Sequence, residues 1–387
     1  MRHRILIVDD EPGLRRAVER VLRKHHELAL AAGPEEALEL CPEFRPDLAI
    51  LDVQMPGMDG YELMGRLKEM SPDLDVILMT GSLDDADRKL ARAIREKAFY
   101  FILKPFDREV LLTLVERCLE LHRLAADNRA HVARLESELA QARAFQQSLL
   151  PAPLLERNGV RFDARYIPCE ALGGDFIDYG ALGDETTTDA DLAFLIADVS
   201  GHGAAAAMLT GIVKSAFQSL RRQGADPAAV VERIASGLAT FDAERFVTIF
   251  CGRVLPGSGT LEYVNAGHPP GVLIEPDGSH TRLKRSGPLV TAALEGLTWR
   301  KQSIPFAEGA RLVLYTDGIV EARTPDDELF GEERFFDEVC AAATGKHARP
   351  ADALLEAILG SVETFTQGRP NDDDLTLLQV SRPTDKP

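Results

Sequence analysis

The chain has 387 residues, of which 45% are apolar and 27% charged, and its formal net charge is −18 at pH 7. This composition is typical of a folded globular protein and excludes a fibrous or largely disordered chain. The acidic excess disfavours a general nucleic-acid binder and adhesion to an anionic membrane, because both need a basic surface. No apolar run reaches the roughly 18 residues of a membrane-spanning helix. We therefore expect neither nucleic acid nor a membrane as a partner.

The cysteine pattern indicates the cellular compartment, and the length indicates the number of domains. Five cysteines are scattered along the chain without a C-x-x-C pair. Scattered cysteines are typical of small buried side chains in a reducing compartment, so we expect a cytoplasmic protein. At roughly 150 residues per domain, the length predicts two or three domains.

The first section, residues 1–121, alternates short apolar runs with amphipathic stretches. The apolar runs are Ile5–Val8, Leu28–Ala31, Leu48–Leu51, Val76–Met79 and Phe99–Leu103. Five strands alternating with helices predict an α/β fold with a doubly wound parallel sheet. Open sheets of this class bind ligands at the carboxyl ends of their strands.

Polar residues follow the predicted strands at that edge: Asp9 and Asp10 after the first, Asp52 after the third, Thr80 after the fourth and Lys104 after the fifth. Three clustered carboxylates repel one another unless a divalent cation lies among them, and hard oxygen ligands suit Mg(II). Thr80 would hydrogen-bond an incoming phosphoryl oxygen, and Lys104 would neutralise its charge.

A long helix is predicted next, because residues 109–150 contain neither Gly nor Pro. We assign residues 122–152 as a helical coiled-coil linker. A heptad seam supports this assignment: Leu114, Cys118, Leu121, Ala125, Asn128, Val132, Leu135, Leu139, Ala142, Gln146 and Leu149. Such a seam predicts a coiled coil and a homodimer. The small residues in the seam keep open the alternative of one amphipathic helix lying on its own domain.

The third section, residues 153–382, mixes strands with helices and predicts a layered α+β domain. The strand-like runs are Leu192–Ala197, Phe246–Val254, Leu261–Val264, Arg311–Tyr315 and Leu375–Val380. The helix-like runs cover about Ala204–Arg222, Pro227–Thr240, Glu332–Ala343 and Ala351–Phe365.

Four motifs in this section place an Asp at a strand edge or beside glycines. They are GGDFID with Asp175, ADVSGHG with Asp198, YTDGIVEA with Asp317 and NDDDLT with Asp373. Carboxylate ligands without Cys pairs indicate Mg(II) or Mn(II) rather than zinc. Four converging Asp would suit a two-metal site that clamps a phosphoryl group and activates water, so no covalent nucleophile is needed.

The first section resembles a two-component response-regulator receiver domain. The resemblance rests on ILIVDDE (Ile5–Glu11), LDVQMPGMDG (Leu51–Gly60), LMTG (Leu78–Gly81) and FILKPF (Phe101–Phe106). It implies that Asp52 accepts a phosphoryl group from a histidine kinase. It also implies an Mg(II) site formed by Asp9, Asp10, Asp52 and the Gln54 carbonyl, and a switch formed by Thr80 and Phe101 with Lys104.

The third section resembles the PPM-type phosphatase domain of the SpoIIE/RsbU group, an α-β-β-α sandwich. Beside the four Asp motifs, the resemblance takes in AFQQSLLP, FVTIF, NAGHPP and LFGEERF. It implies two Mn(II) or Mg(II) ions, with Asp175 on one, Asp198 bridging both, the Val199 carbonyl as a ligand, and Asp317 and Asp373 completing the set. Asp374 is an alternative to Asp373. Asp178 is expected beside the ligands, and His202 either shuttles protons or shapes the glycine turn.

The two resemblances together imply a receiver, a helical linker and a phosphatase. Phosphorylation of Asp52 would then control a metal-dependent protein serine/threonine phosphatase. Its implied substrate is a phosphorylated STAS-type anti-sigma-factor antagonist, whose dephosphorylation releases a sigma factor by partner switching. The alternative is a phosphorylation-controlled binding protein that holds such a partner without catalysis.

Overall fold

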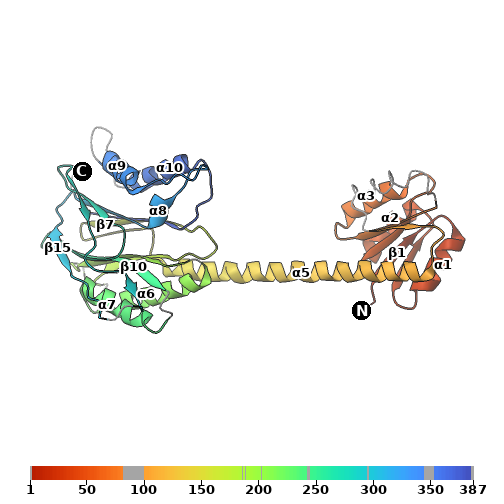
Figure 1. Ribbon diagram of the computed structural model, residues 1–387, viewed down its shortest axis with the longest axis horizontal. Helices are drawn as coiled ribbons and strands as arrows, with labels where there is room; N and C mark the ends of the chain where they lie inside the picture. Colours follow the sequence, from red (N-terminus) through yellow and green to blue (C-terminus); the bar gives the residue numbers. More distant parts are fainter. Residues whose placement is uncertain are drawn as a thin grey trace. The chain divides into compact units, whose positions relative to one another are not determined.

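The structure is a computed structural model (Figure 1). It describes residues 2–81, 100–184, 186–187, 189–201, 203–241, 245–293, 296–343 and 353–384. The chain divides into two compact units, residues 1–136 and 137–387. Among the described residues, none of the helices combines the length and the apolar character needed to cross a membrane.

The first unit is a five-stranded parallel sheet with the strand order β2-β1-β3-β4-β5. Its strands are β1 (Arg4–Val8), β2 (Glu27–Ala31), β3 (Leu48–Asp52), β4 (Asp75–Thr80) and β5 (Tyr100–Leu103). Its described helices are α1 (Pro12–Leu22), α2 (Pro34–Phe44), α3 (Gly60–Met70) and the start of α5 (Arg108–Leu149). The predicted doubly wound fold is confirmed.

Both faces of this sheet are buried, which explains why its strands are continuous apolar runs. On one face the sheet packs against α2 and α3, with Cys41, Leu63 and Leu67 in the core. On the other face it packs against α1 and α5, with Val18 and Leu111 in the core. The strand ends are thereby fixed in position, and with them the polar residues that follow.

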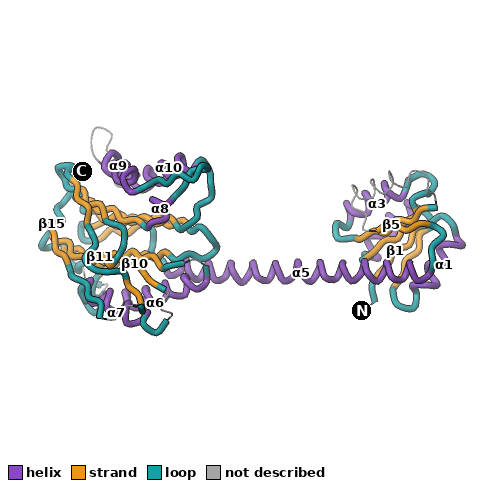
Figure 2. The backbone as a smooth tube through the Cα atoms, in the orientation of Figure 1, coloured by secondary structure: helices purple, strands orange, loops and turns teal. Residues whose placement is uncertain are grey.

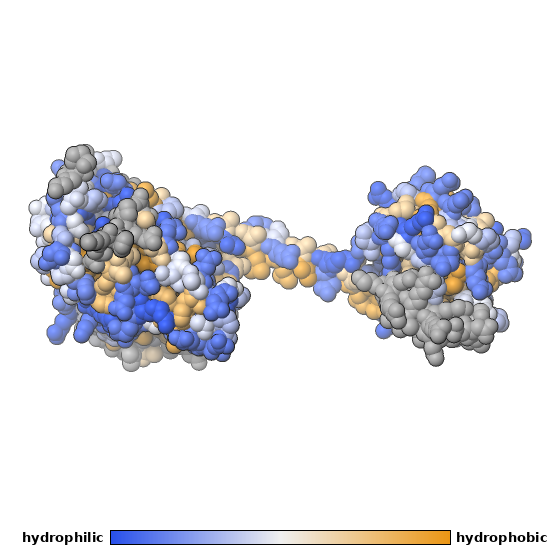
Figure 3. Space-filling view, turned by 90° about the horizontal axis from the view of Figure 1, so that it is seen from above, coloured by the Kyte–Doolittle hydropathy of each residue, from blue (hydrophilic) through white to orange (hydrophobic). Residues whose placement is uncertain are grey.

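Helix α5 begins in the core of the first unit and continues as far as Leu149. Two ion pairs, His122–Asp75 at 2.8 Å and Arg129–Asp73 at 3.3 Å, hold its first part to β4 and to the turn before that strand. Beyond them the predicted seam is exposed, and Leu135 is 59% accessible. Figure 3 shows apolar surface alternating with polar surface along this helix. The middle of the seam, at Val132, Leu135 and Leu139, therefore has no partner within the described part of the chain, and the coiled coil stays a prediction.

The second unit contains two sheets, each with six strands among the described residues (Figure 2). One has the order β15 (Gln302–Pro305), β11 (Thr260–Ala266), β10 (Phe246–Leu255), β9 (Leu192–Val199), β8 (Asp175–Ala181), with β14 (Val290–Thr291) beside β10. The other has the order β13 (His280–Leu283), β12 (Gly271–Ile274), β16 (Arg311–Tyr315), β17 (Leu375–Ser381), β7 (Val160–Ile167), β6 (Leu154–Arg157).

Helices cover the outer face of each sheet in this unit. Helices α6 (Ala204–Arg222) and α7 (Pro227–Leu238) pack on the β8–β11 side, and α8 (Asp317–Glu321), α9 (Glu332–Ala343) and α10 (Leu354–Thr366) on the other (Figure 1). The inner faces enclose a shared core in which Phe162 stacks on Tyr179 and Phe250 on Tyr263. This arrangement is an α-β-β-α sandwich, as the resemblance implies.

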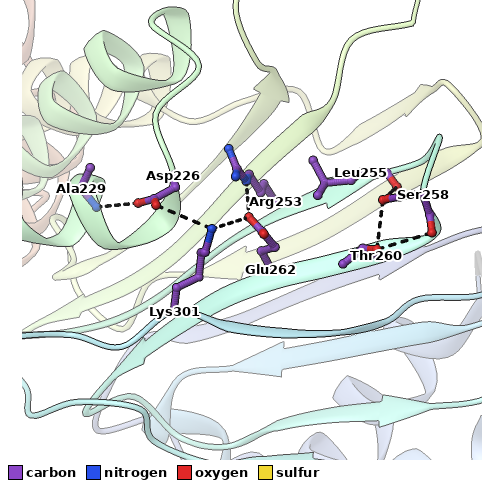
Figure 4. Close-up of polar contacts among 8 residues, drawn as sticks. All are labelled: Asp226, Ala229, Arg253, Leu255, Ser258, Thr260, Glu262 and Lys301. Carbon is purple, nitrogen blue, oxygen red and sulfur yellow. Dashed lines mark hydrogen bonds and ion pairs between the residues drawn. The ribbon is translucent and has the colours of Figure 1, made fainter.

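A polar network ties α7 to the neighbouring sheet (Figure 4). The carboxylate of Glu262 accepts hydrogen bonds from Arg253 at 2.6 Å and Lys301 at 3.1 Å. Lys301 also lies 3.7 Å from Asp226, whose side chain caps α7 through the Ala229 amide. Partial burial acts to raise the pKa of Glu262, but the hydrogen bonds and positive charges of Arg253 and Lys301 lower it below its usual value. The network fixes α7 against the edge of its sheet.

Candidate functional site

The polar residues at the strand ends of the first unit form one pocket. The ammonium group of Lys104 lies 2.7 Å from Asp9 Oδ2 and 2.9 Å from Asp52 Oδ2. Asp9 and Thr80 are fully buried, and Asp52 is 6% exposed. The Thr80 hydroxyl has no hydrogen-bond partner among the described residues, so it is available to a group bound beside Asp52. Phe101, the other expected switch residue, lies half-buried on β5 next to β4.

Backbone geometry brings the chain close to Asp52. A Cβ at Gly60 would lie 2.2 Å from the Asp52 carbonyl oxygen, so only glycine allows α3 to begin there. The Gln54 amide donates to Asp52 Oδ1 at 3.3 Å, and Gly57 before the helix has a φ of +84°. The turn MPGMDG therefore encloses the side chain that ends β3.

The pocket fits a divalent cation. One carboxylate oxygen from each of Asp9, Asp10 and Asp52 lies within 4.8 Å of the others, and Asp10 is exposed to solvent. Burial raises the pKa of Asp52, although the hydrogen bond from Lys104 works in the opposite direction. A cation among these oxygens would offset the repulsion that Lys104 alone does not remove.

The second site lies at the end of the sandwich, where β8, β9 and β10 run side by side. Asp175 on β8 is directly opposite Asp198 on β9, and Asp198 is directly opposite Thr248 on β10. Residues paired in this way have Cβ atoms roughly 4.5–5.5 Å apart on the same face of the sheet. Two sequence motifs 23 positions apart therefore place their carboxylates side by side.

Asp175 is held by hydroxyl groups from the opposite sheet. Its Oδ2 accepts hydrogen bonds from Thr316 at 2.7 Å and Thr376 at 2.5 Å, and its side chain is 4% exposed. Thr316 directly follows β16 and Thr376 lies on β17, so these bonds join the two sheets at the site. With Oδ2 occupied, Oδ1 of Asp175 remains for a cation.

The two adjacent aspartates before β17 have different surroundings. Asp374 is 2% exposed, and its two oxygens accept hydrogen bonds from the amides of Cys169, at 2.9 Å, and Asp175, at 3.2 Å. Asp373 is exposed, and its Oδ1 accepts a hydrogen bond from the Asp374 amide. Asp374 thus braces the loop before Asp175, and Asp373 is the better candidate for a metal ligand.

Glycines next to these aspartates permit the close approach of the chain segments. A Cβ at Gly173 would lie 2.0 Å from Asp374 Oδ2, and one at Gly318 would lie 2.1 Å from the Asp374 carbonyl oxygen. A Cβ at Gly174 would lie 2.6 Å from the Val199 carbonyl oxygen, which is the expected backbone ligand. The glycines of GGDFID and YTDGIVEA are therefore required for the carboxylates to meet.

Burial, followed by repulsion between neighbouring carboxylates, raises the pKa values of this cluster. Burial, then the charge of Asp198, raises the pKa of Asp175 well above its usual range. Burial, then the charges of Asp317, Asp373 and Asp374, raises the pKa of Asp198. Burial and Glu321 raise the pKa of Asp317. Crowded hard oxygen ligands of this kind fit divalent cations such as Mg(II) or Mn(II).

Two expected residues do not join this cluster. Asp178 lies three residues after Asp175 on β8, and its carboxylate is 3.2 Å from the ammonium group of Lys214 on α6. Because side chains alternate along a strand, Asp178 faces the helices whereas Asp175 faces the opposite sheet. His202 lies outside the described residues, and its expected role stays a prediction.

A buried histidine near the site is structural in its contacts. His268 is fully buried, and its Nδ1 lies 2.9 Å from the hydroxyl of Thr248, the residue opposite Asp198. Burial lowers the pKa of His268 to about 3, so the imidazole is neutral. It supports the strand that lies beside Asp198.

The end of α5 contacts the same site, which the sequence motifs did not predict in detail. The buried Gln146 donates through Nε2 to the Gly173 carbonyl at 2.7 Å, and its Oε1 accepts from the Gly173 amide at 3.2 Å. The Lys214 ammonium group hydrogen-bonds the Leu149 carbonyl as well as Asp178. Both contacts hold the last turn of the helix to the segment that carries Asp175.

Family models match both units. The model described as "Stage II sporulation protein E (SpoIIE)" matches residues 188–383, about half of the chain, and that of the "Response regulator receiver domain" matches residues 5–116. The chain belongs to the SpoIIE family. Its first unit is a receiver domain, and its second is a phosphatase domain of the SpoIIE type. Both resemblances drawn from the motifs are confirmed.

Two curated relatives of this SpoIIE-family chain are distant in sequence and longer than it is. Protein IcfG of Synechocystis sp. is 28% identical over 273 residues, 63% of this chain and 41% of that protein. Phosphoserine phosphatase RsbP of Bacillus subtilis is 28% identical over 189 residues, 48% of this chain and 45% of RsbP. The chain thus spans less than half of each relative. The SiaA-PP2C domain of Pseudomonas aeruginosa, 21% identical, shares the fold over 65% of this chain and 98% of that domain, with a TM-score of 0.55.

The raised carboxylate pKa values predict how metal stabilises the second unit. Without metal, the folded unit holds protons on Asp175, Asp198 and Asp317 that the unfolded chain releases near pH 4, so its stability falls as pH rises above that value. Bound Mn(II) would replace these protons. We expect the Mn(II)-induced increase in the unfolding midpoint to grow by several degrees between pH 5.5 and pH 8.

Fluorescence of Trp299 reports the unfolding midpoint of the second unit alone. It is the only tryptophan of the chain and is buried in the core of the second unit. Thermal unfolding would be followed with Mn(II) or with a chelator at each pH. An increase that is independent of pH would contradict the proton-metal exchange.

The contrast between Asp373 and Asp374 gives a second prediction. Asp373→Ala should weaken Mn(II) binding at least tenfold in calorimetry. Asp374→Ala should mainly lower the unfolding midpoint at saturating Mn(II), because it leaves two amides without acceptors at about 1–3 kcal/mol each. A larger loss of Mn(II) affinity in Asp374→Ala than in Asp373→Ala would reverse the assignment.

Proposed function

We propose that this chain is a protein serine/threonine phosphatase controlled by phosphorylation of its receiver domain. The observation that carries the proposal is the convergence of Asp175, Asp198, Asp317, Asp373 and Asp374 from four separate segments at one end of the sandwich. Crowded carboxylates of this kind are costly in a metal-free fold, and a metal-dependent hydrolase needs them. The name of the relative RsbP, a phosphoserine phosphatase, supports the same reaction class.

In this proposal the residues of the second unit hold and orient two ions, Mn(II) or Mg(II). Asp175 and Asp198 hold them from one sheet, Asp317 and Asp373 from the other, and the Val199 carbonyl adds a ligand. The ions would supply the positive charge that draws in a phosphoryl group and activates water. Thr316, Thr376 and Asp374 fix the ligands in place before substrate arrives, so little reorganisation is needed.

The proposed substrate is a phosphoserine or phosphothreonine on a STAS-type anti-sigma-factor antagonist. Its dephosphorylation would release a sigma factor by partner switching in the cytoplasm. The similarity to RsbP, which is named a phosphoserine phosphatase, supports phosphoserine as the substrate group. The STAS-type partner follows from the resemblance to the SpoIIE/RsbU group. Turnover of phosphorylated STAS protein by the full chain tests it, and turnover of unrelated phosphoproteins at the same rate would contradict it.

The receiver domain is the proposed input. A histidine kinase would transfer a phosphoryl group to Asp52 with Mg(II) held by Asp9, Asp10, Asp52 and the Gln54 carbonyl. Lys104 already lies 2.9 Å from Asp52 and would pair with the new charge. The unpartnered Thr80 hydroxyl would hydrogen-bond the phosphoryl group and shift with Phe101.

Helix α5 is the proposed connection between input and output. Its apolar seam, exposed at Val132, Leu135 and Leu139, would pair with a second copy in a homodimer. Its last turn is bonded to Gly173, two residues before Asp175. A change in helix pairing would therefore change how Gln146 holds the segment that carries this ligand.

The alternative is a binding protein that holds its phosphorylated partner without turnover. The intact carboxylate cluster favours catalysis, because a binding protein has no need for five mutually repelling groups. The same cluster is the target of the decisive test.

Hydrolysis of para-nitrophenyl phosphate with Mn(II) tests the function. We expect metal-dependent turnover that is lost in Asp198→Ala and that changes when a small acyl-phosphate donor is added. The change should be absent in Asp52→Ala, which keeps basal turnover. No turnover of this ester or of a phosphorylated STAS protein by a folded chain would favour the binding protein.

Gln146 gives a test of the connection. Gln146→Leu keeps the side-chain volume but removes both hydrogen bonds to Gly173, so the ratio of activities with and without the donor should fall to about one. Gln147→Leu is the matched control, because Gln147 is exposed on the same turn and should leave the ratio unchanged. A normal ratio in Gln146→Leu would contradict the connection.

Sedimentation of the same samples tests the homodimer, which a monomer at micromolar concentration would contradict.

A further inference from the structure

One guanidinium group lies over the glycine loop that follows Asp198. Arg245 Nη1 donates to the Ser200 carbonyl at 2.9 Å. A Cβ at Gly201 would lie 2.6 Å from the same nitrogen, and Gly201 has a φ of +86°. Glycine at this position therefore permits both the backbone turn and the close approach of the guanidinium group. Arg245 is packed onto the loop rather than extended into solvent.

The strand register places this group near the metal ligands. Asp198 pairs with Thr248 and Val199 with Val247, and the next pair is joined by a hydrogen bond from Ser200 to the Phe246 carbonyl. Ser200 is thus two residues beyond Asp198, or about 7 Å along the strand. A phosphoryl group bound beside Asp198 would be within reach of the long arginine side chain that is anchored there.

Arg245 has no acidic partner within the described part of the chain. No described carboxylate lies within salt-bridge distance of its guanidinium group, although Asp and Glu outnumber Lys and Arg by 62 to 44. By contrast, Arg165, Arg253, Arg282 and Arg369 of the same unit all pair with carboxylates. A single neutral hydrogen bond leaves most of the five donors of Arg245 available to an anion.

The net charge of the metal-loaded site indicates that a further cationic group is needed to bind a phosphate dianion. Two divalent cations would neutralise Asp175, Asp198, Asp317 and Asp373 and would leave the charge of Asp374 uncompensated. A phosphomonoester dianion approaching this site would therefore find no net attraction from the ions and their ligands alone. A fixed guanidinium group at the rim supplies positive charge and planar, bidentate donors that match phosphoryl oxygens.

We infer that Arg245 is a substrate-binding residue that contacts the phosphoryl group of the phosphoserine or phosphothreonine. The inference rests on the proposed phosphatase function and adds a cationic contact that none of the aspartate motifs contains. Arg245 acts on phosphoryl binding and leaves metal binding to the aspartates.

Inorganic phosphate, the product and a minimal ligand, is the probe. In the full chain saturated with Mn(II), Arg245→Gln should weaken phosphate binding at least tenfold in calorimetry and raise the inhibition constant of phosphate and the KM for para-nitrophenyl phosphate to a similar extent. The Mn(II) affinity should stay within twofold of that of the parent. The unfolding midpoint measured by Trp299 fluorescence should stay within about 2 °C of the parent value. Arg245→Lys keeps the charge without the fork and should recover part of the loss.

Arg222→Gln is the matched control. It removes the same charge from the exposed far end of α6, roughly 27 Å from the start of that helix. Phosphate binding within twofold of the parent in Arg245→Gln, or an equal loss in Arg222→Gln, would overturn the inference. A parallel loss of Mn(II) affinity in Arg245→Gln would also overturn it, because Arg245 would then only support the loop.

The binding measurement separates this inference from the proposed function. A parent chain that binds phosphate with Mn(II) but hydrolyses no ester would contradict the phosphatase, and the Arg245 variants would still be compared by calorimetry. A parent chain that turns over substrate with no Arg245 effect would contradict the inference alone.

Discussion

Crowding of carboxylates at strand ends is the constraint on which both units depend. In the receiver domain, Asp9 and Asp52 are buried around one ammonium group, that of Lys104. In the phosphatase domain, the largest effects on the pKa of Asp198 after burial all come from other carboxylates. The first cluster is therefore partly neutralised by the chain itself. The second has hydroxyl and amide donors in place but needs protons or cations to balance its charge.

The cost of this second cluster explains the local architecture around it. The donors to these carboxylates come from both sheets and from the loop before β8. They are the hydroxyls of Thr316 and Thr376 and the amides that donate to Asp374. Each bond ties a ligand to a different segment, so the cluster forms only when the sandwich is closed at that end. Since closure of the sandwich and the placement of these carboxylates depend on the same contacts, a movement of any one segment would displace the expected metal ligands.

The receiver sheet and its strand-end residues were predictable from continuous apolar runs. Strands that are buried on both faces are apolar at nearly every position, so their ends are easy to locate in the sequence. The motif aspartates of the phosphatase domain were predictable as site residues because glycines lie beside them in the sequence. Strand β8 was not, because it is buried at every position yet carries two aspartates. Asp175 and Asp178 consequently lie on opposite faces, and only Asp175 is at the site. The partners of Gln146 and Arg245 depend on segments far away in sequence, which no local pattern encodes.

The contact between Gln146 and Gly173 has a magnitude suited to a switch. Two neutral hydrogen bonds contribute about 1 kcal/mol each, so their loss would change the population of the bonded arrangement roughly 30-fold. This lies within the 1–3 kcal/mol typical of coupling between two sites. A stronger contact would hold the Asp175 segment in one state regardless of the receiver domain, and a weaker one would not bias it. Helix α5 is continuous from the core of the receiver domain to Gln146, so a rotation of this helix about its axis would act directly on that contact.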